Sequence, residues 1–205
     1  MILEHSAGER STVITLGDYI DRGPRSCDVI ELLMNWRPDR VTLVNLMGNH
    51  ESMMWEVCNN LAEIDWWIKN GGDQTLASYG QSSKDNPDLS AVPRRHLNWI
   101  YNLATLHVDK HRVFVHAAVD PKIPLDRQNQ QTLLWKRYPE GFAGGHGRRH
   151  VVHGHHASPD APIVTSGKTN LDGLAYKTGR LVVGVFDDDY AGGAVEFLEI
   201  IRKLD

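Results

Sequence analysis

The strongest constraint on the fold is an order of elements in which a β-branched run is followed by a polar loop and then by a helical pattern. Residues 12–16 predict a buried strand that ends at Gly17, and residues 27–36 carry apolar side chains at helical spacing. A second strand is predicted over residues 41–46. A strand, a helix and a second strand in this order form a βαβ unit, which builds parallel sheets. The sequence therefore predicts an α/β fold.

The rest of the chain continues this mixture of helices and strands. Beyond residue 46 the sequence predicts two helices, two strands and a final hairpin, which cover residues 51–69, 94–103, 111–115, 151–152 and 181–200. The apolar positions of the first of these helices are Met53, Met54, Val57, Leu61, Ile64 and Ile68. Residues 81–93 predict a surface loop. No linker or repeat interrupts the sequence, so a single domain over residues 1–205 is predicted.

Composition excludes several classes of protein. A net charge of −4 gives the molecule no basic field for nucleic acid. Cys27 and Cys58 are the only cysteines, and they are predicted to be reduced thiols. No apolar run reaches the roughly 18 residues of a membrane span, and the first residues do not form a secretory signal. The expected location is the cytoplasm.

Polar motifs follow four of the predicted strands. The first two are Gly17-Asp18-Tyr19-Ile20-Asp21-Arg22-Gly23 and Gly48-Asn49-His50-Glu51. The other two are His116 and His155, which follow the strands over 111–115 and 151–152. Any one of these motifs alone is more typical of a turn or a helix cap. Because ligands bind at the carboxyl ends of strands in open α/β sheets, the four together predict a functional site.

The side chains of these motifs suit a divalent cation and a phosphate group. The predicted metal ligands are a carboxylate, an amide oxygen and two imidazoles, from Asp18, Asn49, His116 and His155. Such a mixed set favours Mn²⁺, Fe or Zn²⁺, any of which would activate water and polarise a phosphoryl oxygen.

Three further motif residues have roles that fit this chemistry. Arg22 offers a planar fork that matches two phosphate oxygens. His50 directly follows a predicted ligand, and Asp21 is expected to hold its ring in one tautomer. A protonated His50 would then donate to the leaving alkoxide as a general acid.

Together these motifs resemble the signature blocks of the phosphoprotein phosphatases within the calcineurin-like metallophosphoesterases. Residues 70–80 and 133–137 resemble the bacterial branch, which includes serine/threonine protein phosphatases and diadenosine tetraphosphate hydrolases. The resemblance implies a two-sheet β-sandwich flanked by helices and a two-metal centre, commonly of manganese or iron.

The resemblance also implies a role for each motif residue. Asp18 would be the bridging ligand, and Asn49, His116 and His155 would complete one metal site. His50 would be the catalytic acid, paired with Asp21. Arg22 and Arg137 would bind the substrate phosphate, and Asp172 would support the site from behind the ligands.

The sequence departs from the family at its start. The family's first strand ends in Asp-x-His-Gly, which supplies ligands to the first metal, and this chain has no Asp-x-His-Gly. Before Asp18 the only candidates are Glu4 and His5. A second metal would therefore lack ligands, and a missing first strand would leave strand edges exposed, through which a homodimer could form. A late start of the sequence, a degenerate relative and a rebuilt edge stay open as explanations.

The leading hypothesis for function is metal-dependent hydrolysis of phosphate monoesters by an enzyme of the serine/threonine protein phosphatase type, impaired by the missing ligands. The substrate would be a phosphoprotein or a small phosphoester. A dinucleoside polyphosphate hydrolase is the alternative enzyme. A non-catalytic relic that binds a metal or a phosphate is the alternative outside enzymes.

Overall fold

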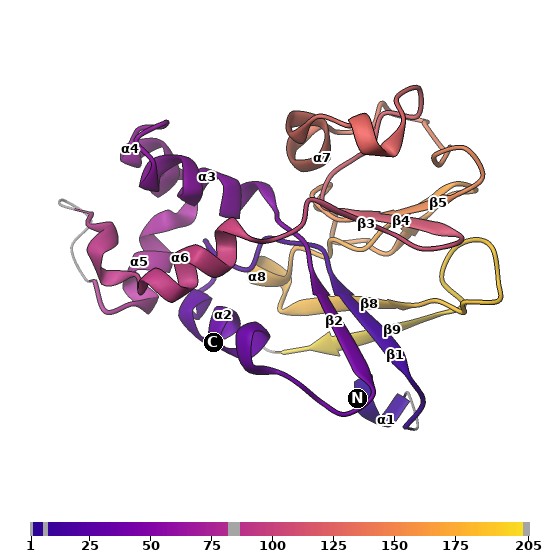
Figure 1. Cartoon of the computed structure of the whole chain (residues 1–205), viewed down its shortest axis with the longest axis horizontal. Coiled ribbons are helices and arrows are strands. Elements are labelled where there is room, and N and C mark those ends of the chain that lie inside the picture. The colour runs from indigo at the N-terminus through magenta and orange to yellow at the C-terminus, as the bar shows by residue number, and fades with distance from the viewer. Residues whose placement is uncertain (1, 6–7, 82–86, 203–205) are drawn as a thin grey trace. The chain divides into compact units, whose positions relative to one another are not determined.

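The computed structural model describes residues 2–5, 8–81 and 87–202 (Figure 1). Contacts between Cα atoms divide the chain into two compact units. Unit 1 comprises Met1–Leu46 and His50–Ala104, and unit 2 comprises Met47–Asn49 and Thr105–Asp205. The expectation of one domain over residues 1–205 stays a prediction.

Unit 1 contains the predicted βαβ element. Strand β1 (Ser11–Thr15) is followed by helix α2 (Ser26–Asn35) and strand β2 (Val41–Asn45). The two strands lie side by side and pair in parallel, with Ser11 opposite Val41 and Thr15 opposite Asn45 (Figure 1). The loops after β1 and β2, which carry the first two motifs, therefore leave the same end of this small sheet.

The single helix predicted over residues 51–69 is wrong, because the chain breaks there. It forms α3 (Asn49–Cys58), α4 (Ile64–Trp67) and a π-turn, η1 (Ile68–Gly72), before α5 (Asp73–Ser78). Asn60 ends α3 with a left-handed φ of 55°, and the N–H of Leu61 donates to the carbonyl of Glu56 at 2.9 Å. Leu61 is consequently 65% exposed, although its spacing placed it with the core residues.

Short elements complete the described part of unit 1. They are α1 (Ile2–His5), the 3-10 turn η2 (Leu89–Ala91) and α6 (Arg94–Tyr101). Helix α2 packs against α5 and α6 and buries Ile30 completely.

Unit 2 is built on a five-stranded sheet with the order β3-β4-β5-β7-β6. Its strands are β3 (Leu106–Val108), β4 (Arg112–Val115), β5 (His150–His153), β6 (Ile163–Val164) and β7 (Lys168–Asn170). The three central strands are parallel, and β4 and β5 are buried at every position. The strands predicted over 111–115 and 151–152 are confirmed, and their ends again carry the polar motifs.

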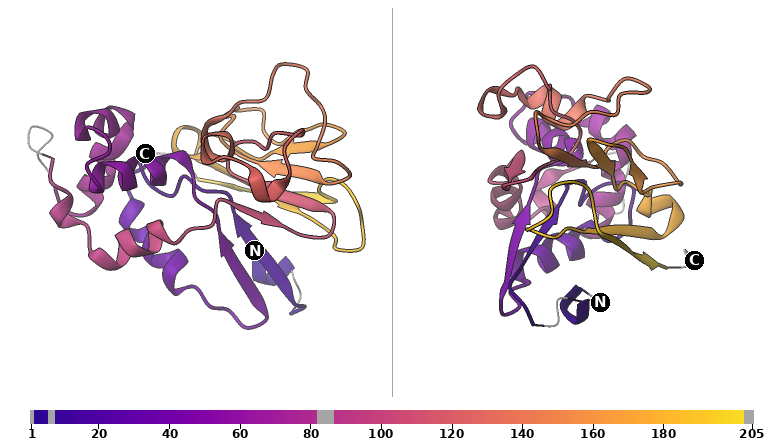
Figure 2. Two further views of the ribbon diagram at one scale, coloured as in Figure 1. Left: turned by 45° about the horizontal axis from the view of Figure 1, so that its top comes forward. Right: turned by 90° about the vertical axis from the view of Figure 1, so that its right-hand side faces the viewer.

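The predicted hairpin at the end of the sequence is also confirmed. Strands β8 (Arg180–Val185) and β9 (Glu196–Ile201) pair antiparallel. Figure 2 shows this hairpin, in yellow, beside the sheet of unit 2, and the rings of Phe114 and Phe186 meet edge to face at 5.7 Å. The helices of unit 2 are η3 (Leu125–Arg127), α7 (Gln130–Trp135) and α8 (Ala175–Thr178).

The predicted α/β fold class is confirmed, with helices beside several sheets. Of the helices that the structure describes, none combines the length and apolar character needed to cross a membrane.

The break after α3 generates a test of stability. We expect Met54→Ala to lower the free energy of unfolding by about 2–5 kcal/mol, because Met54 is fully buried and its loss leaves a cavity. Leu61→Ala should change it by no more than about 0.5 kcal/mol, because Leu61 is largely exposed. Urea titration of both variants measures the difference. Equal losses of stability in the two variants would show that Leu61 is buried and that α3 continues into the core.

Candidate active site

The loop after β1 is held by one buried carboxylate. Glu51, on α3, is fully buried and accepts hydrogen bonds from the backbone N–H groups of Asp18 at 2.9 Å, Tyr19 at 2.7 Å and Ile20 at 3.3 Å. Three N–H donors that converge on a buried carboxylate stabilise its negative charge. In the sequence, Glu51 is recognisable only as part of a motif. Its role as an anchor for the Asp18 loop was not predicted.

The hydroxyl of Tyr19 ties the ends of the two strands of unit 1 together. It donates to the carbonyl of Leu46, after β2, at 2.6 Å, and it accepts from the N–H of Gly17, after β1, at 3.2 Å. Burial first, and then the charge of Glu51, raises the pKa of Tyr19 far above its usual range, so the hydroxyl keeps its proton. These two hydrogen bonds fix the distance between the ends of β1 and β2, where the loops that carry Asp18 and Asn49 begin.

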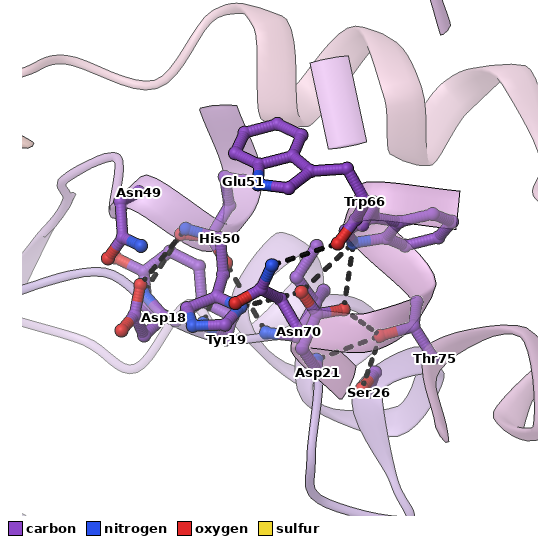
Figure 3. A network of polar contacts seen from close by, with 12 residues as sticks. Asp18, Tyr19, Asp21, Ser26, Asn49, His50, Glu51, Trp66, Asn70 and Thr75 are labelled. Atoms are coloured by element: carbon purple, nitrogen blue, oxygen red, sulfur yellow. Dashed lines mark hydrogen bonds and ion pairs between the residues drawn. The ribbon is translucent and has the colours of Figure 1, made fainter. Parts of the chain in front are cut away.

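His50 and Asp21 form a buried pair within unit 1 (Figure 3). Nδ1 of His50 lies 2.6 Å from Oδ2 of Asp21, and both side chains are almost fully buried. Burial alone would lower the pKa of His50, but the hydrogen bond to Asp21 and the charges of Asp18 and Asp21 together raise it above its ordinary value. The raised pKa favours the protonated ring that a general acid requires.

Several of the predicted site residues adopt a strained backbone. Asp18, Asp21, Arg22 and His155 all have left-handed φ values, of 59°, 72°, 62° and 59°. Residues other than glycine rarely adopt positive φ values, and those that do concentrate at functional sites.

Two glycines make room for this loop and its partner. The carbonyl of Gly71 accepts from the N–H of Arg22 at 3.1 Å, and a Cβ at position 71 would lie 2.7 Å from the backbone nitrogen of Arg22. A Cβ at position 72 would lie 2.5 Å from the indole ring of Trp67. In the Asn70-Gly71-Gly72 segment, the last two residues must therefore be glycine, because the Arg22 backbone and the buried Trp67 ring leave no space for a Cβ.

Unit 2 brings three of the predicted metal ligands together. Oδ1 of Asn49 lies 2.9 Å from Nε2 of His116 and 3.0 Å from Nδ1 of His155, and the two imidazole rings meet edge to face at 5.1 Å. His116 follows β4, and His155 follows β5. The N–H of Gly154 donates to the carbonyl of His116 at 2.8 Å, which joins the two loops.

These three donors fit a divalent cation. Two ligands about 2.1 Å from a cation and at right angles to each other lie about 3.0 Å apart, which is the separation found between the amide oxygen and each imidazole nitrogen. Among the described residues, no three side chains of His, Cys, Asp or Glu converge as a metal site. The donor set of unit 2 depends on the neutral amide of Asn49.

Asp18 contacts the residue that follows Asn49. Its Oδ1 accepts a hydrogen bond of 3.3 Å from the backbone N–H of His50, the residue after Asn49. Its role as a ligand stays a prediction, as do the roles of His50 and Arg22 toward substrate.

The remaining predicted residues have other surroundings. Arg137 is exposed in the segment after α7, and its role toward phosphate stays a prediction. Asp172 caps a turn by accepting from the N–H of Leu174 at 3.0 Å. Glu4 and His5 are exposed on α1. The one Asp-x-His triplet of the sequence begins at Asp109, whose carboxylate accepts from the N–H groups of His111 and Arg112 at the start of β4.

The Glu51 anchor generates a second prediction. Glu51→Gln places an amide N–H₂ group against backbone N–H donors, so we expect the free energy of unfolding to fall by about 1–3 kcal/mol. Urea titration measures the change. Glu63→Gln, at an exposed position of the same unit, is the matched control and should cost less than about 0.5 kcal/mol. A Glu51→Gln protein as stable as this control would contradict the anchoring role.

Comparison with known proteins identifies the family of this chain. The sequence profile of the family described as calcineurin-like phosphoesterase matches residues 2–186. A segment of 61 residues is 38% identical to serine/threonine-protein phosphatase 2 of Escherichia coli (strain K12), and it covers 30% of this chain and 25% of that relative. The match thus spans a quarter of the relative's length.

Two solved structures share the fold. One is the crystal structure of a candidate diadenosine tetraphosphatase, with a TM-score of 0.63, 18% identity, and coverage of 97% of this chain and 85% of the other. The second is a metallophosphoesterase from Sphaerobacter thermophilus, with a TM-score of 0.56, 14% identity, and coverage of 98% and 82%. From the profile match over most of its length, the chain belongs to the calcineurin-like phosphoesterases, a family of hydrolases that use divalent metal ions.

Proposed function

We propose that this chain hydrolyses phosphate monoesters in the manner of a serine/threonine protein phosphatase. The observation that carries the proposal is the placement of two consecutive residues, Asn49 and His50. The amide oxygen of Asn49 meets two imidazole nitrogens, and the ring of His50 is held by Asp21. In the proposed enzyme, Asn49 would bind the cation and His50, the next residue along the chain, would donate the proton.

Asn49, His116 and His155 would hold the cation, and Asp18 is proposed as the carboxylate ligand. A bound divalent cation polarises a phosphoryl oxygen and lowers the pKa of water. Manganese is the proposed metal, since a set of oxygen and imidazole donors without thiolates suits it.

The chain's own residues would bind the ester and move the proton. The guanidinium of Arg22 binds the phosphate, with Arg137 as a second proposed contact. The ring of His50, fixed through Nδ1 by Asp21, gives the proton on Nε2 to the oxygen of the leaving group.

The buried His50–Asp21 pair favours a monoester over a dinucleoside polyphosphate. A serine alkoxide is a strong base and leaves slowly without a proton, whereas a phosphate group has a second pKa of about 6 and leaves as a stable anion. A dedicated proton donor therefore contributes more when the leaving group is an alcohol. Hydrolysis of a dinucleoside polyphosphate remains the second candidate function. One of the two similar solved structures is described as a candidate diadenosine tetraphosphatase.

Three further expectations stay predictions. They are a phosphoprotein or small phosphoester as the partner, a homodimer formed through exposed strand edges, and a location in the cytoplasm. The alternative of a non-catalytic relic also stays open to test, because it requires that no more than one metal binds per chain and that no ester is cleaved.

Metal binding tests the ligand set. We expect Asn49→Ala, His116→Ala and His155→Ala each to weaken Mn²⁺ binding at least about tenfold, measured by isothermal titration, because loss of supporting groups around a ligand already has an effect of that size. His107→Ala, on β3 of the same sheet, is the control and should bind as the unmodified chain does. Elemental analysis counts the metal per chain, and two equivalents would exclude the relic.

Activity tests the proposed substrate. With Mn²⁺ added, the chain should hydrolyse a phosphoserine peptide faster than diadenosine tetraphosphate when both are present in one assay. Asp18→Asn should lower the rate on the order of 100-fold, and chelation of the metal should abolish hydrolysis until Mn²⁺ is restored. Faster cleavage of the dinucleotide would replace the proposal by the second candidate, and an inert chain that binds Mn²⁺ would favour the relic.

A further inference from the structure

We propose that Trp67 and Thr75 are positioning residues that lock the Asp21 carboxylate so that it fixes the ring of His50. Nothing in the sequence motifs assigns either residue to the site. The inference rests on the proposed function only for what the fixed ring does to substrate, since the lock itself is a property of unit 1.

Both oxygens of Asp21 are fully engaged (Figure 3). Oδ1 accepts from the hydroxyl of Thr75 at 2.6 Å, and Oδ2 lies 2.6 Å from Nδ1 of His50. The indole N–H of Trp67 is shared between them, 3.1 Å from Oδ1 and 2.9 Å from Oδ2. The carboxylate cannot turn about its bond to Cβ without breaking one of these contacts.

Thr75 closes a ring of hydrogen bonds with Asp21. Its hydroxyl oxygen accepts from the backbone N–H of Asp21 at 2.8 Å, while its single proton goes to Oδ1. Since that proton is used, the hydroxyl of Ser26, 3.2 Å away, must donate to Thr75. The Thr75 hydroxyl thereby fixes both the backbone and the side chain of Asp21, whose φ is left-handed at 72°.

Trp67 is placed for this contact by the segment that follows it. The side chain is fully buried, and Gly72 passes so close to the indole ring that no Cβ fits. Any buried tryptophan needs one acceptor for its N–H, and a backbone carbonyl is enough. Here the N–H points between the two oxygens of the carboxylate that holds His50, which joins the buried tryptophan to the proposed proton donor.

The consequence is a ring that cannot rotate between proton transfers. A general acid contributes about 10²–10⁴-fold to rate when it is held within hydrogen-bond reach of its target. Loosening Asp21 should forfeit part of that factor. The loss should be larger for an alkoxide leaving group than for nitrophenolate, which needs little protonation.

Leaving-group dependence tests the kinetic consequence. In Thr75→Val and Trp67→Phe we expect kcat for a phosphoserine peptide to fall about tenfold or more, with KM little changed and a much smaller fall for p-nitrophenyl phosphate. Thr75→Ser keeps the hydroxyl and should restore the peptide rate. Trp66→Phe removes the neighbouring indole, which does not contact Asp21, and is the matched control. Equal losses on both substrates would overturn the positioning role in favour of a general loss of structure.

Nuclear magnetic resonance tests the lock without any reaction. In the metal-free chain, the Nδ1 proton of His50 should give a downfield, slowly exchanging signal. Thr75→Val and Trp67→Phe should lose this signal or speed its exchange, and Thr75→Ser and Trp66→Phe should keep it. Should Trp67→Phe fail to fold, Thr75→Val, with nearly unchanged volume, decides.

The two measurements separate the inference from the proposed function. An unmodified chain that cleaves neither ester contradicts the proposed function, yet the His50 signal still decides whether Asp21 is locked. An unchanged His50 signal in Thr75→Val overturns the inference even when the unmodified chain is fully active.

Discussion

The rest of unit 1 depends on the hydrogen bonds that the Glu51 carboxylate accepts from backbone N–H groups of the loop after β1. The loop after β1 holds Asp18, Asp21 and Arg22 in left-handed conformations that short sequences do not adopt unaided. Contacts from outside the loop must therefore offset the cost. The carboxylate of Glu51 accepts from the N–H of Asp18, the hydroxyl of Thr75 from that of Asp21, and the carbonyl of Gly71 from that of Arg22. The backbone of every charged residue of the motif is thus hydrogen-bonded to a group outside the loop.

Two consecutive residues at one helix terminus contact different partners. Asn49 and His50 are the first two residues of α3, and successive residues of a helix point about 100° apart. One side chain therefore meets the imidazoles after β4 and β5, whereas the next meets Asp21 in the loop after β1.

Short-range sequence patterns predicted much of the fold and of the candidate site, whereas contacts between residues far apart in the sequence were not predicted. The strands of the βαβ element, the central strands of unit 2 and the last hairpin follow from their β-branched runs, and the motifs at their ends follow from the rule for parallel sheets. The break after α3 depends on Asn60, which interrupts a spacing that otherwise continues. Trp67 and Thr75 lie 46 and 54 residues beyond Asp21, so no local pattern couples them to it. Strands β6 and β7 are too short to show a period.

The packing of Gly72 under the indole of Trp67 constrains how this protein can change. A methyl group at position 72 would collide with the ring, so the substitution is tolerable only after the tryptophan has been replaced by something smaller. Replacing the tryptophan first leaves a void and removes the N–H donor that the two oxygens of Asp21 share. The two positions are therefore epistatic, and a lineage that loses the indole has no selective reason to keep the glycine. Drift at position 72 would be the visible trace of a relative that has abandoned the lock on Asp21.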